Sequence, residues 1–234
     1  TPLVESMEQD LSDWLQKSHQ LMDKRSEAAN NKVHFDLHIE SPLLLTFLND
    51  LLLKIDQSYP NASIKTSNWD YDSIDALIRG EADIAFTGRE THPRSKESLD
   101  LMPYSIDFEV LFNDEPKVFL RDDHPALKEE WALDTFLKYT QINIVWEKSE
   151  TWALDEVLKE IGRTRNVGLT LSSFEQALYM AAQPEHQMLT TSPGYCEDYI
   201  KQLHPNLVAL PLPLAREQLE KLTIPFTMMW HKRN

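Results

Sequence analysis

Strand-like and helix-like segments alternate regularly from residue 33 onward, and this alternation restricts the possible folds more than any other feature. Residues 33–40 alternate apolar and polar side chains, as a half-buried strand does, and Ser41-Pro42 then opens an apolar-striped helix. Strands are expected over 62–69 and 83–88, with a short helix that ends at Gly80 between them. Because β-α-β crossovers are right-handed, this order predicts a parallel sheet with helices on its faces.

The same pattern returns in the second half of the chain. The expected strands there cover 117–121, 142–146, 167–171 and 187–191, and the expected helices cover 130–138, 149–161, 173–182 and 192–203. Extended segments at 104–112 and 207–213 are suited to connect the two halves. The prediction is an α/β fold of two Rossmann-like lobes joined by two crossover segments, with 29–112 and 209–234 in lobe I and 113–208 in lobe II.

Residues 1–28 differ from the rest of the chain. Met7, Leu11, Trp14, Ser18 and Leu21 recur at alternating spacings of four and three, which is typical of an amphipathic helix with a narrow seam. We expect a linker helix that pairs with another chain. The alternative is a helix packed on its own domain.

Charge and cysteine content exclude several classes of protein. Lys and Arg number 23 against 38 Asp and Glu, and the formal net charge of −15 repels phosphate backbones. The single Cys196 excludes an internal disulfide and indicates a reducing compartment. No apolar stretch approaches the roughly 18 residues of a membrane span, and the first ten residues lack a signal-peptide pattern. We expect a soluble, cytoplasmic protein with no membrane partner.

The motifs of common enzymes and metal sites are missing from the sequence. Its five glycines are dispersed, which excludes a P-loop and a dinucleotide fingerprint, and no Gly-x-Ser-x-Gly elbow occurs. Cys196 has an acidic neighbour and no flanking His. His34, Asp36 and His38 share a strand face, but the two histidines would lie about 13 Å apart, too far to share an ion. We therefore expect no catalysis, no metal and no cofactor.

Polar side chains gather where the expected strands end, the place at which parallel sheets bind ligands. Helix N-termini there offer N–H groups suited to an anionic group. Each hydroxyl has the alternative role of a simple helix cap, and each tryptophan that of padding between lobes. The convergence of both lobes predicts a ligand site between them, and its candidates are Ser41, Trp69, Asp70, Thr87, Ser149, Trp152 and Thr191.

Several stretches, in order, resemble the effector-binding domain of LysR-type transcriptional regulators. They are Ser41–Leu44, Ile74–Phe86, Leu111–Glu115, Asp122–Ala126, Leu210–Pro213 and Met228–Lys232. The stretches Asn68–Ser73 and Thr151–Asp155 are similar to one subgroup of these regulators in particular. The resemblance covers nearly the whole chain, and its specificity lies in the ordered set.

The resemblance implies a type II periplasmic-binding-protein-like fold that binds a small-molecule effector between its lobes. DNA would be bound only by an N-terminal winged helix-turn-helix outside this chain. The chain itself would also lack the family's C-terminal helix. The matching pocket positions are Ser41, Asp70, Thr87 and Gly88, with Glu147 to Ser149 matched by loop position alone. Because many relatives carry Thr or Ser at Asp70, its acidic side chain disfavours a simple carboxylate ligand.

The resemblance also implies a homodimer or homotetramer. In such an assembly the 43–55 helix of one chain would meet the 174–182 helix of its partner. The alternative functions are a two-lobed solute-binding protein and an enzyme that uses the same cleft, although no acid–base pair or nucleophile is evident for the latter.

Overall fold

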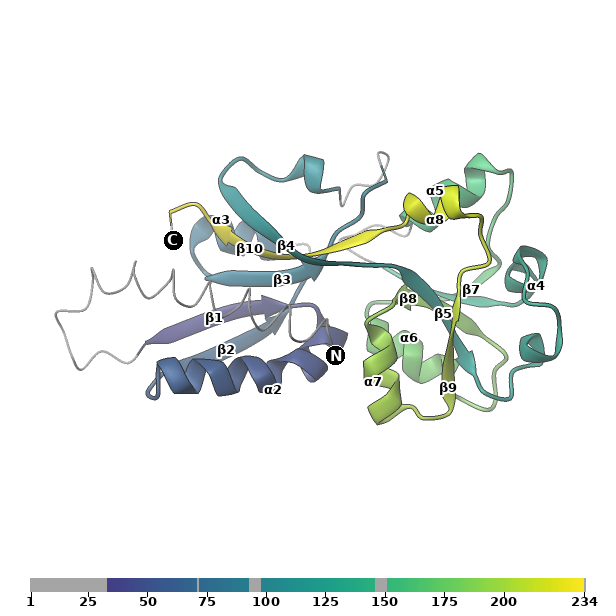
Figure 1. The fold of residues 1–234 in the computed structure, drawn as a ribbon, viewed down its shortest axis with the longest axis horizontal. Coiled ribbons are helices and arrows are strands. Elements are labelled where there is room, and N and C mark those ends of the chain that lie inside the picture. The colour runs from purple at the N-terminus through teal and green to yellow at the C-terminus, as the bar shows by residue number, and fades with distance from the viewer. Residues whose placement is uncertain (1–32, 71, 93–97, 146–150, 234) are drawn as a thin grey trace.

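The structure is a computed structural model that describes residues 33–70, 72–92, 98–145 and 151–233, without the side chains of 42–46. Two five-stranded sheets, each flanked by helices, form two lobes that lie side by side (Figure 1). The prediction of a two-lobed α/β fold is confirmed. The linker helix expected over 1–28 lies outside the described residues.

Lobe I contains the strands β1 (His34–Ile39), β2 (Ser63–Asn68), β3 (Ile84–Gly88), β4 (Ile106–Asp114) and β10 (Ile224–His231), with helices α2 (Ser41–Ser58) and α3 (Ser73–Arg79) and the 3-10 turn η1 (Leu99–Leu101). Their order in the sheet is β2-β1-β3-β10-β4. β1 pairs in parallel with β2 and β3, as predicted. The sheet is nevertheless mixed, because β10 runs antiparallel to both β3 and β4.

Lobe II repeats this plan with β5 (Pro116–Arg121), β6 (Gln141–Ile144), β7 (Val167–Leu171), β8 (Leu189–Pro193) and β9 (Leu207–Pro211), and with α4 (Leu133–Lys138), α5 (Ala153–Glu160), α6 (Phe174–Ala181), α7 (Cys196–Leu203) and the 3-10 turn η2 (Pro125–Lys128). The order is β7-β6-β8-β5-β9, with β6 parallel to β7 and β8, and β5 antiparallel to β8 and β9.

Two connections join the lobes. The first runs straight from β4 into β5, and the second returns from β9 through α8 (Arg216–Glu220) to β10 (Figure 1). β9 lies wholly in the sheet of lobe II, and Leu212 and Leu222 pack into that lobe's core. The chain therefore rejoins the first sheet at Ile224, later than the expected boundary at 209, because β9 pairs with β5 along its whole length.

Helix starts differ from the expectation in lobe II. Ser192 and Pro193 end β8, and α7 begins only at Cys196, because the ladder between β8 and β5 extends to Pro193 opposite Pro116. By contrast, Gly80 ends α3 as predicted, with a left-handed φ of 70°.

One apolar cluster extends through both lobes. Phe47, Leu51 and Ile55 of α2 pack on the first sheet, and Phe174 of α6 and Tyr199 of α7 belong to the same cluster. The amino end of α2 lies against lobe II in Figure 1, on the side of α6 and α7. The lobes are therefore in apolar contact on this side. Among the described helices, none is both long and apolar enough to cross a bilayer.

Candidate functional site

The candidate site is the junction where the carboxyl ends of β1 and β3 meet the amino ends of α5 and α7. Glu40 directly follows β1, and its side chain is buried, with 2% of the residue exposed. Its Oε2 accepts hydrogen bonds from Thr87 Oγ1 at 2.8 Å and from the backbone N of Gly88 at 2.7 Å. Its Oε1 accepts from the hydroxyl of Tyr195, which belongs to lobe II. Glu40 thus links the two lobes directly.

Burial dominates the ionisation of Glu40. Desolvation raises the pKa of its carboxyl group to about 7, against the hydrogen bonds from Gly88 and Thr87, which favour the charged form. The neighbouring acidic groups Asp114 and Glu175 raise this pKa further. The carboxyl group therefore changes charge near neutral pH.

A second carboxyl group, on Asp114, stands at the end of β4 where the chain crosses between lobes. Its Oδ2 accepts from the backbone N of Tyr195 at 3.1 Å, so Asp114 caps the amino end of α7. Burial raises its pKa to about 6. A Cβ on Gly194 would lie 2.6 Å from Asp114 Oδ1 and 2.6 Å from the backbone O of Glu115, so only glycine permits this close approach.

A third carboxyl group from lobe I reaches the amino end of α5. Glu90 Oε1 accepts from the backbone N of Ala153 at 2.9 Å. The helix start is fixed in turn, because Asp155 accepts from the backbone N of Trp152 at 2.8 Å and from both Nε and a terminal nitrogen of Arg165, each at 2.8 Å. Carboxyl groups of the chain itself thus occupy the helix N-termini that the sequence suggested for a ligand.

Buried hydroxyl groups stand beside these contacts on β8. Thr190 Oγ1 donates to the backbone O of Ile142 at 3.2 Å. Thr191 Oγ1 and Ser192 Oγ are buried and have no hydrogen-bond partner in the described part of the chain. The register with β5 places them on opposite faces, because Thr191 pairs with Val118 and Ser192 with Lys117.

Five of the predicted site residues belong to this junction. Thr87 and Gly88 contact Glu40, and Ser41 directly follows it. Trp152 caps α5, and its Nε1 donates to the backbone O of Ile144 at 2.9 Å. Thr191 lies near the end of β8.

The remaining predicted residues do not join these contacts. Trp69 directly follows β2 and is buried in the cluster beneath α3, with Ala76 and Leu77 of that helix. Asp70 is exposed and accepts from the backbone N of Asp72 at 2.9 Å, so it orders the turn into α3. Glu147 and Ser149 lie outside the described residues.

Sequence reasoning missed Glu40, Glu90, Asp114 and Tyr195. The first three are acidic residues at or just beyond the ends of strands, where the prediction rests on hydroxyls and helix caps. The order of a buried strand, Glu40 and Ser41-Pro42 is a local signal for a carboxyl group at a sheet edge. The role of Tyr195 had no local signal, because its partners lie in the other lobe and in the crossover.

Among its described residues, the junction has neither an activated thiol nor a metal-binding cluster. Burial, together with Glu40 and Asp114, raises the pKa of the Cys196 thiol, which is therefore protonated and inert. The described residues hold no cluster of three His, Cys, Asp or Glu side chains able to bind a metal. His38, one of the residues weighed for a metal, instead places Nδ1 2.7 Å from Ser73 Oγ.

Comparison with known proteins identifies the family. The model of the LysR substrate binding domain matches residues 34–234. The chain is 58% identical over 235 residues to the HTH-type transcriptional regulator YidZ of Citrobacter koseri, an alignment that covers 100% of this chain and 73% of that protein.

Solved structures share the fold. A probable transcriptional regulator, PA0477 of Pseudomonas aeruginosa, superposes with a TM-score of 0.71 at 20% identity, covering 95% of this chain and 70% of the other. The regulatory domain of MexT, a transcriptional activator of the same organism, gives 0.66 at 16% identity, covering 88% and 91%. The chain belongs to the LysR family of transcriptional regulators and forms their effector-binding domain.

Proposed function

We propose that the chain senses a small-molecule effector at the junction between its lobes and transmits binding to a DNA-binding helix-turn-helix module. The support for DNA binding is the name of the curated relative, an HTH-type transcriptional regulator. That name also favours a cytoplasmic regulator over a solute-binding protein and over an enzyme.

The proposed effector site consists of the junction residues. Ser41, Thr87, Gly88, Trp152 and Thr191 are its candidates from the sequence, and the contacts of Glu40 and Tyr195 add these two. Trp69 and Asp70 stay candidates from the sequence, and Glu147 and Ser149 stay candidates by loop position only.

The observation that carries the proposal is the pair of unsatisfied hydroxyls on β8. Burying a hydroxyl without a partner costs about 1–3 kcal/mol, so such groups call for an explanation. Thr191 Oγ1 and Ser192 Oγ have this property within the described residues, and they lie one strand from the end of β6, where Trp152 is held. An effector that bonds to one of them would offset this cost.

The interlobe contacts supply a way to transmit binding. Glu40 with Tyr195, and Glu90 with Ala153, each join the two lobes. His92 Nε2 adds a third contact, 3.4 Å from Glu160 Oε1. An effector that binds one arrangement of these contacts better than another shifts the population of lobe arrangements by its difference in affinity.

The test begins with a thermal-shift screen of a metabolite library, because a ligand at 100-fold excess over Kd adds about 2.7 kcal/mol of stability. A hit is then titrated against Thr191→Val, which keeps the side-chain shape and removes the hydroxyl. We expect about fivefold weaker binding, the effect of one neutral hydrogen bond. Thr170→Val, on the exposed edge strand β7, is the matched control. Equal affinity of all three proteins would place the effector site elsewhere.

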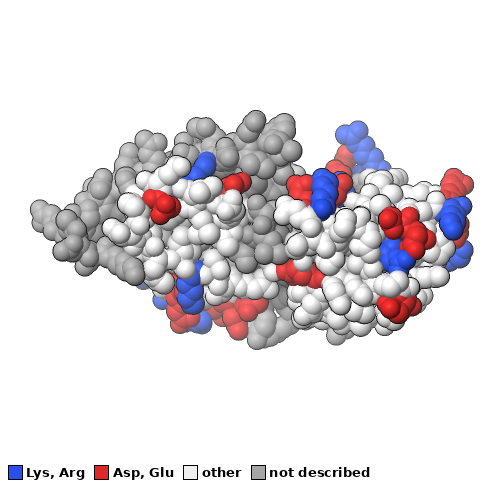
Figure 2. Space-filling view, turned by 90° about the horizontal axis from the view of Figure 1, so that it is seen from below, with Lys and Arg blue, Asp and Glu red and all other residues white. Residues whose placement is uncertain are grey.

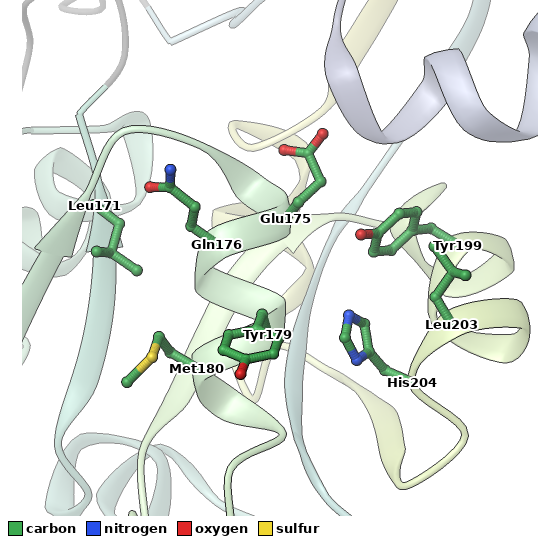
Figure 3. A pocket seen from close by; sticks show the side chains of 8 residues that line it. All are labelled: Leu171, Glu175, Gln176, Tyr179, Met180, Tyr199, Leu203 and His204. Carbon is green, nitrogen blue, oxygen red and sulfur yellow. The ribbon is translucent and has the colours of Figure 1, made fainter.

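We also propose that the chain self-associates as a homodimer or homotetramer through α2 and the groove between α6 and α7. Leu52 and Leu53 on α2 are 37% and 56% exposed, beside a groove of about 460 Å³ that reaches β2. The groove on lobe II has a volume of about 610 Å³ and is lined mainly by apolar and aromatic side chains, with Tyr179 55% exposed (Figure 3).

The surroundings of these grooves support this proposal. In Figure 3, Tyr179 and Met180 project from α6, while Tyr199, Leu203 and His204 approach from α7 and the turn after it. Figure 2 shows the lower face of the molecule, where charged side chains stand in small separate groups with uncharged surface between them. Residues 1–28 remain a proposed further contact between chains.

A further inference from the structure

The carboxyl group of Glu40 has the surroundings that a protein gives to a bound carboxylate. Three donors converge on it: the hydroxyl of Thr87, the backbone N–H of Gly88 and the hydroxyl of Tyr195. Donors from a backbone amide and from hydroxyls, aimed at one buried acid, are the usual means of recognising an anionic ligand group. Here the acid belongs to the chain.

The niche around this carboxyl group is closely fitted. A Cβ on Gly88 would lie 2.7 Å from Ile224 Cγ2 and 3.6 Å from Glu40 Oε2, so the absence of a side chain there leaves the backbone N–H open to Glu40. The ring of Tyr195 packs edge-on against Phe226, with centroids 5.7 Å apart, which fixes the position of its hydroxyl. The donors are therefore held in place from both lobes.

The charges around the niche oppose a second anion. Asp114 and Glu175 lie near enough to Glu40 to affect its ionisation. Glu175 Oε2 is buried and has no hydrogen-bond partner in the part of the chain that the structure describes. The nearby cation Lys117 is paired with Glu197. An effector that brought a further carboxylate here would meet acidic groups and find the donors already in use.

We propose that Glu40 is a specificity-determining residue: it fills the carboxylate niche of the effector site with the chain's own carboxyl group and so excludes effectors that are recognised through a carboxylate at this position. The inference rests on the proposed function in one respect, that the junction is the effector site. The inference implies that the group which an effector presents to this niche is neutral or positively charged.

The test is chemical rescue of a Glu40→Ala variant. Removing the side chain leaves the three donors without an acceptor, and we expect the melting temperature to fall. Acetate should restore part of it, by about 5 °C at twentyfold excess over its dissociation constant, whereas chloride at the same ionic strength should not. Acetamidine, which has the shape of acetate and a positive charge, should give no recovery.

Three further variants serve as controls. Wild-type protein and Glu40→Gln keep the niche filled, so acetate should shift their melting temperatures no more than chloride does. Glu175→Ala also removes one acidic group of the junction but opens no set of donors, so acetate should not stabilise it. In Glu40→Ala/Thr87→Val the rescue should weaken about tenfold in apparent affinity, because one donor is lost.

Two results would overturn the proposal: acetate that acts on Glu40→Ala no better than chloride, or acetate that stabilises wild-type protein equally. If Glu40→Ala does not accumulate folded, it is refolded in acetate and in chloride, and equal yields in the two salts count against the niche. Because the rescue needs no natural effector, an effector screen without hits would leave this result unchanged, and the failures of the two proposals are distinguishable.

Discussion

In lobe I the strand ends at the junction carry carboxyl groups, whereas in lobe II they carry hydroxyl groups and the amino ends of helices. Both sheets have the same order: three parallel strands, then one antiparallel strand, then an edge strand that runs antiparallel to it. Glu40 and Glu90 of lobe I accept hydrogen bonds, and Tyr195 and Ala153 of lobe II donate them. The two lobes thus share one topology, but lobe I supplies the acceptors of these interlobe hydrogen bonds and lobe II supplies the donors.

This difference explains why the lobes meet through specific polar contacts as well as apolar ones. Two identical edges would place acceptors against acceptors, with a desolvation cost on both sides. Opposite roles let Glu40 and Glu90 of lobe I each find a donor in lobe II. The arrangement also makes the contact dependent on pH, because it is built on carboxyl groups.

The largest effect is expected from Glu40→Gln, which keeps the shape of the acceptor and removes its charge. The pKa of Glu40 is raised from 4.5 to about 7, so between these values the folded chain binds more protons than the unfolded chain. The unfolding free energy of wild-type protein therefore falls as pH rises through this window, by about 3 kcal/mol at about 1.4 kcal/mol per unit.

Denaturant unfolding from pH 4.5 to pH 8 checks this prediction. The variant should gain on wild-type protein by that amount as pH rises, while both keep the decrease in stability that the raised pKa of Asp114 produces between pH 3.8 and about pH 6. Glu81→Gln is the control: Arg79 lowers the pKa of this exposed carboxylate below 4.5, so its difference from wild-type protein should stay nearly constant over this pH range. Parallel curves for Glu40→Gln and wild-type protein would contradict the raised pKa of this buried carboxyl group.

The next effect concerns lobe II. Arg165 is buried, its side chain only 3% exposed, and it holds Asp155, which positions the amino end of α5. Arg165→Leu leaves Asp155 and the side chain of Asn143 without this partner, and we expect a loss of about 2–3 kcal/mol, reduced by the partial exposure of Asp155. Arg163→Leu breaks an exposed pair with Asp134 and should cost less than about 1 kcal/mol. Similar losses for the two variants in urea unfolding would refute the prediction.

The sequence predicts the parallel strands of each sheet well, and it predicts the places of β9 and β10 less well. β1, β2 and β3 alternate with helices along the chain, so local alternation and right-handed crossovers predict that they are parallel. The place of β9 depends on its pairing with β5. The place of β10 depends on its pairing with β3, which ends at Gly88, more than a hundred residues earlier in the chain. Alternation within a strand contains no information on such partners.

The site was predicted in the same uneven way. Thr87 and Trp152 follow from the rule that ligands bind at strand ends, because this rule needs only the local pattern, whereas Gly88 follows from the family resemblance. Trp69 shows the limit of that rule: it lies at a strand end but faces the cluster under α3. Tyr195 was beyond it, since its importance arises from Asp114 and Glu40, which are distant in sequence.

A substitution at the crossover would disturb both lobes together. Gly194→Ala places a Cβ 2.6 Å from the backbone O of Glu115, an atom that cannot rotate away. We expect a loss of about 2 kcal/mol, typical of overpacking, measured by thermal and urea unfolding. In Gly168→Ala the new Cβ meets only the side chain of Thr140, so a smaller loss is expected. Equal losses would mean that the crossover is not closely packed on α7.

Tyr195→Phe removes one donor and keeps the ring against Phe226. The loss should be about 1 kcal/mol, because one acceptor position of Glu40 is left without its partner. It should shrink below pH 6, where Glu40 is protonated in both proteins. Tyr199→Phe, one turn along α7, should stay within about 0.5 kcal/mol of wild-type protein. A loss that does not vary with pH would assign the effect of Tyr195→Phe to packing alone.

The smallest effect on folding, and a large one on assembly, is expected at the outer surface of α2. Leu53 is 56% exposed and belongs to none of the core clusters of the described residues, so Leu53→Glu should change the melting temperature little. At −15 per chain, a dimer must overcome mutual repulsion through apolar contact, and one added carboxylate in that contact should dissociate it. Leu48 is unsuitable for this test, because it packs against the core.

Sedimentation at micromolar concentration and about 0.15 M salt decides between the surfaces. A two-fold contact buries the same patch twice, so α2 of each chain would meet the α6–α7 groove of the other. Leu203→Glu, which changes that groove, should then dissociate the dimer as Leu53→Glu does, while Leu101→Glu, exposed but outside both grooves, should not. A dimer split by Leu53→Glu alone would mean that α2 pairs with α2. A dimer that survives both substitutions would refute this interface and leave residues 1–28 as the expected contact, because repulsion between the acidic chains must be offset by apolar burial somewhere.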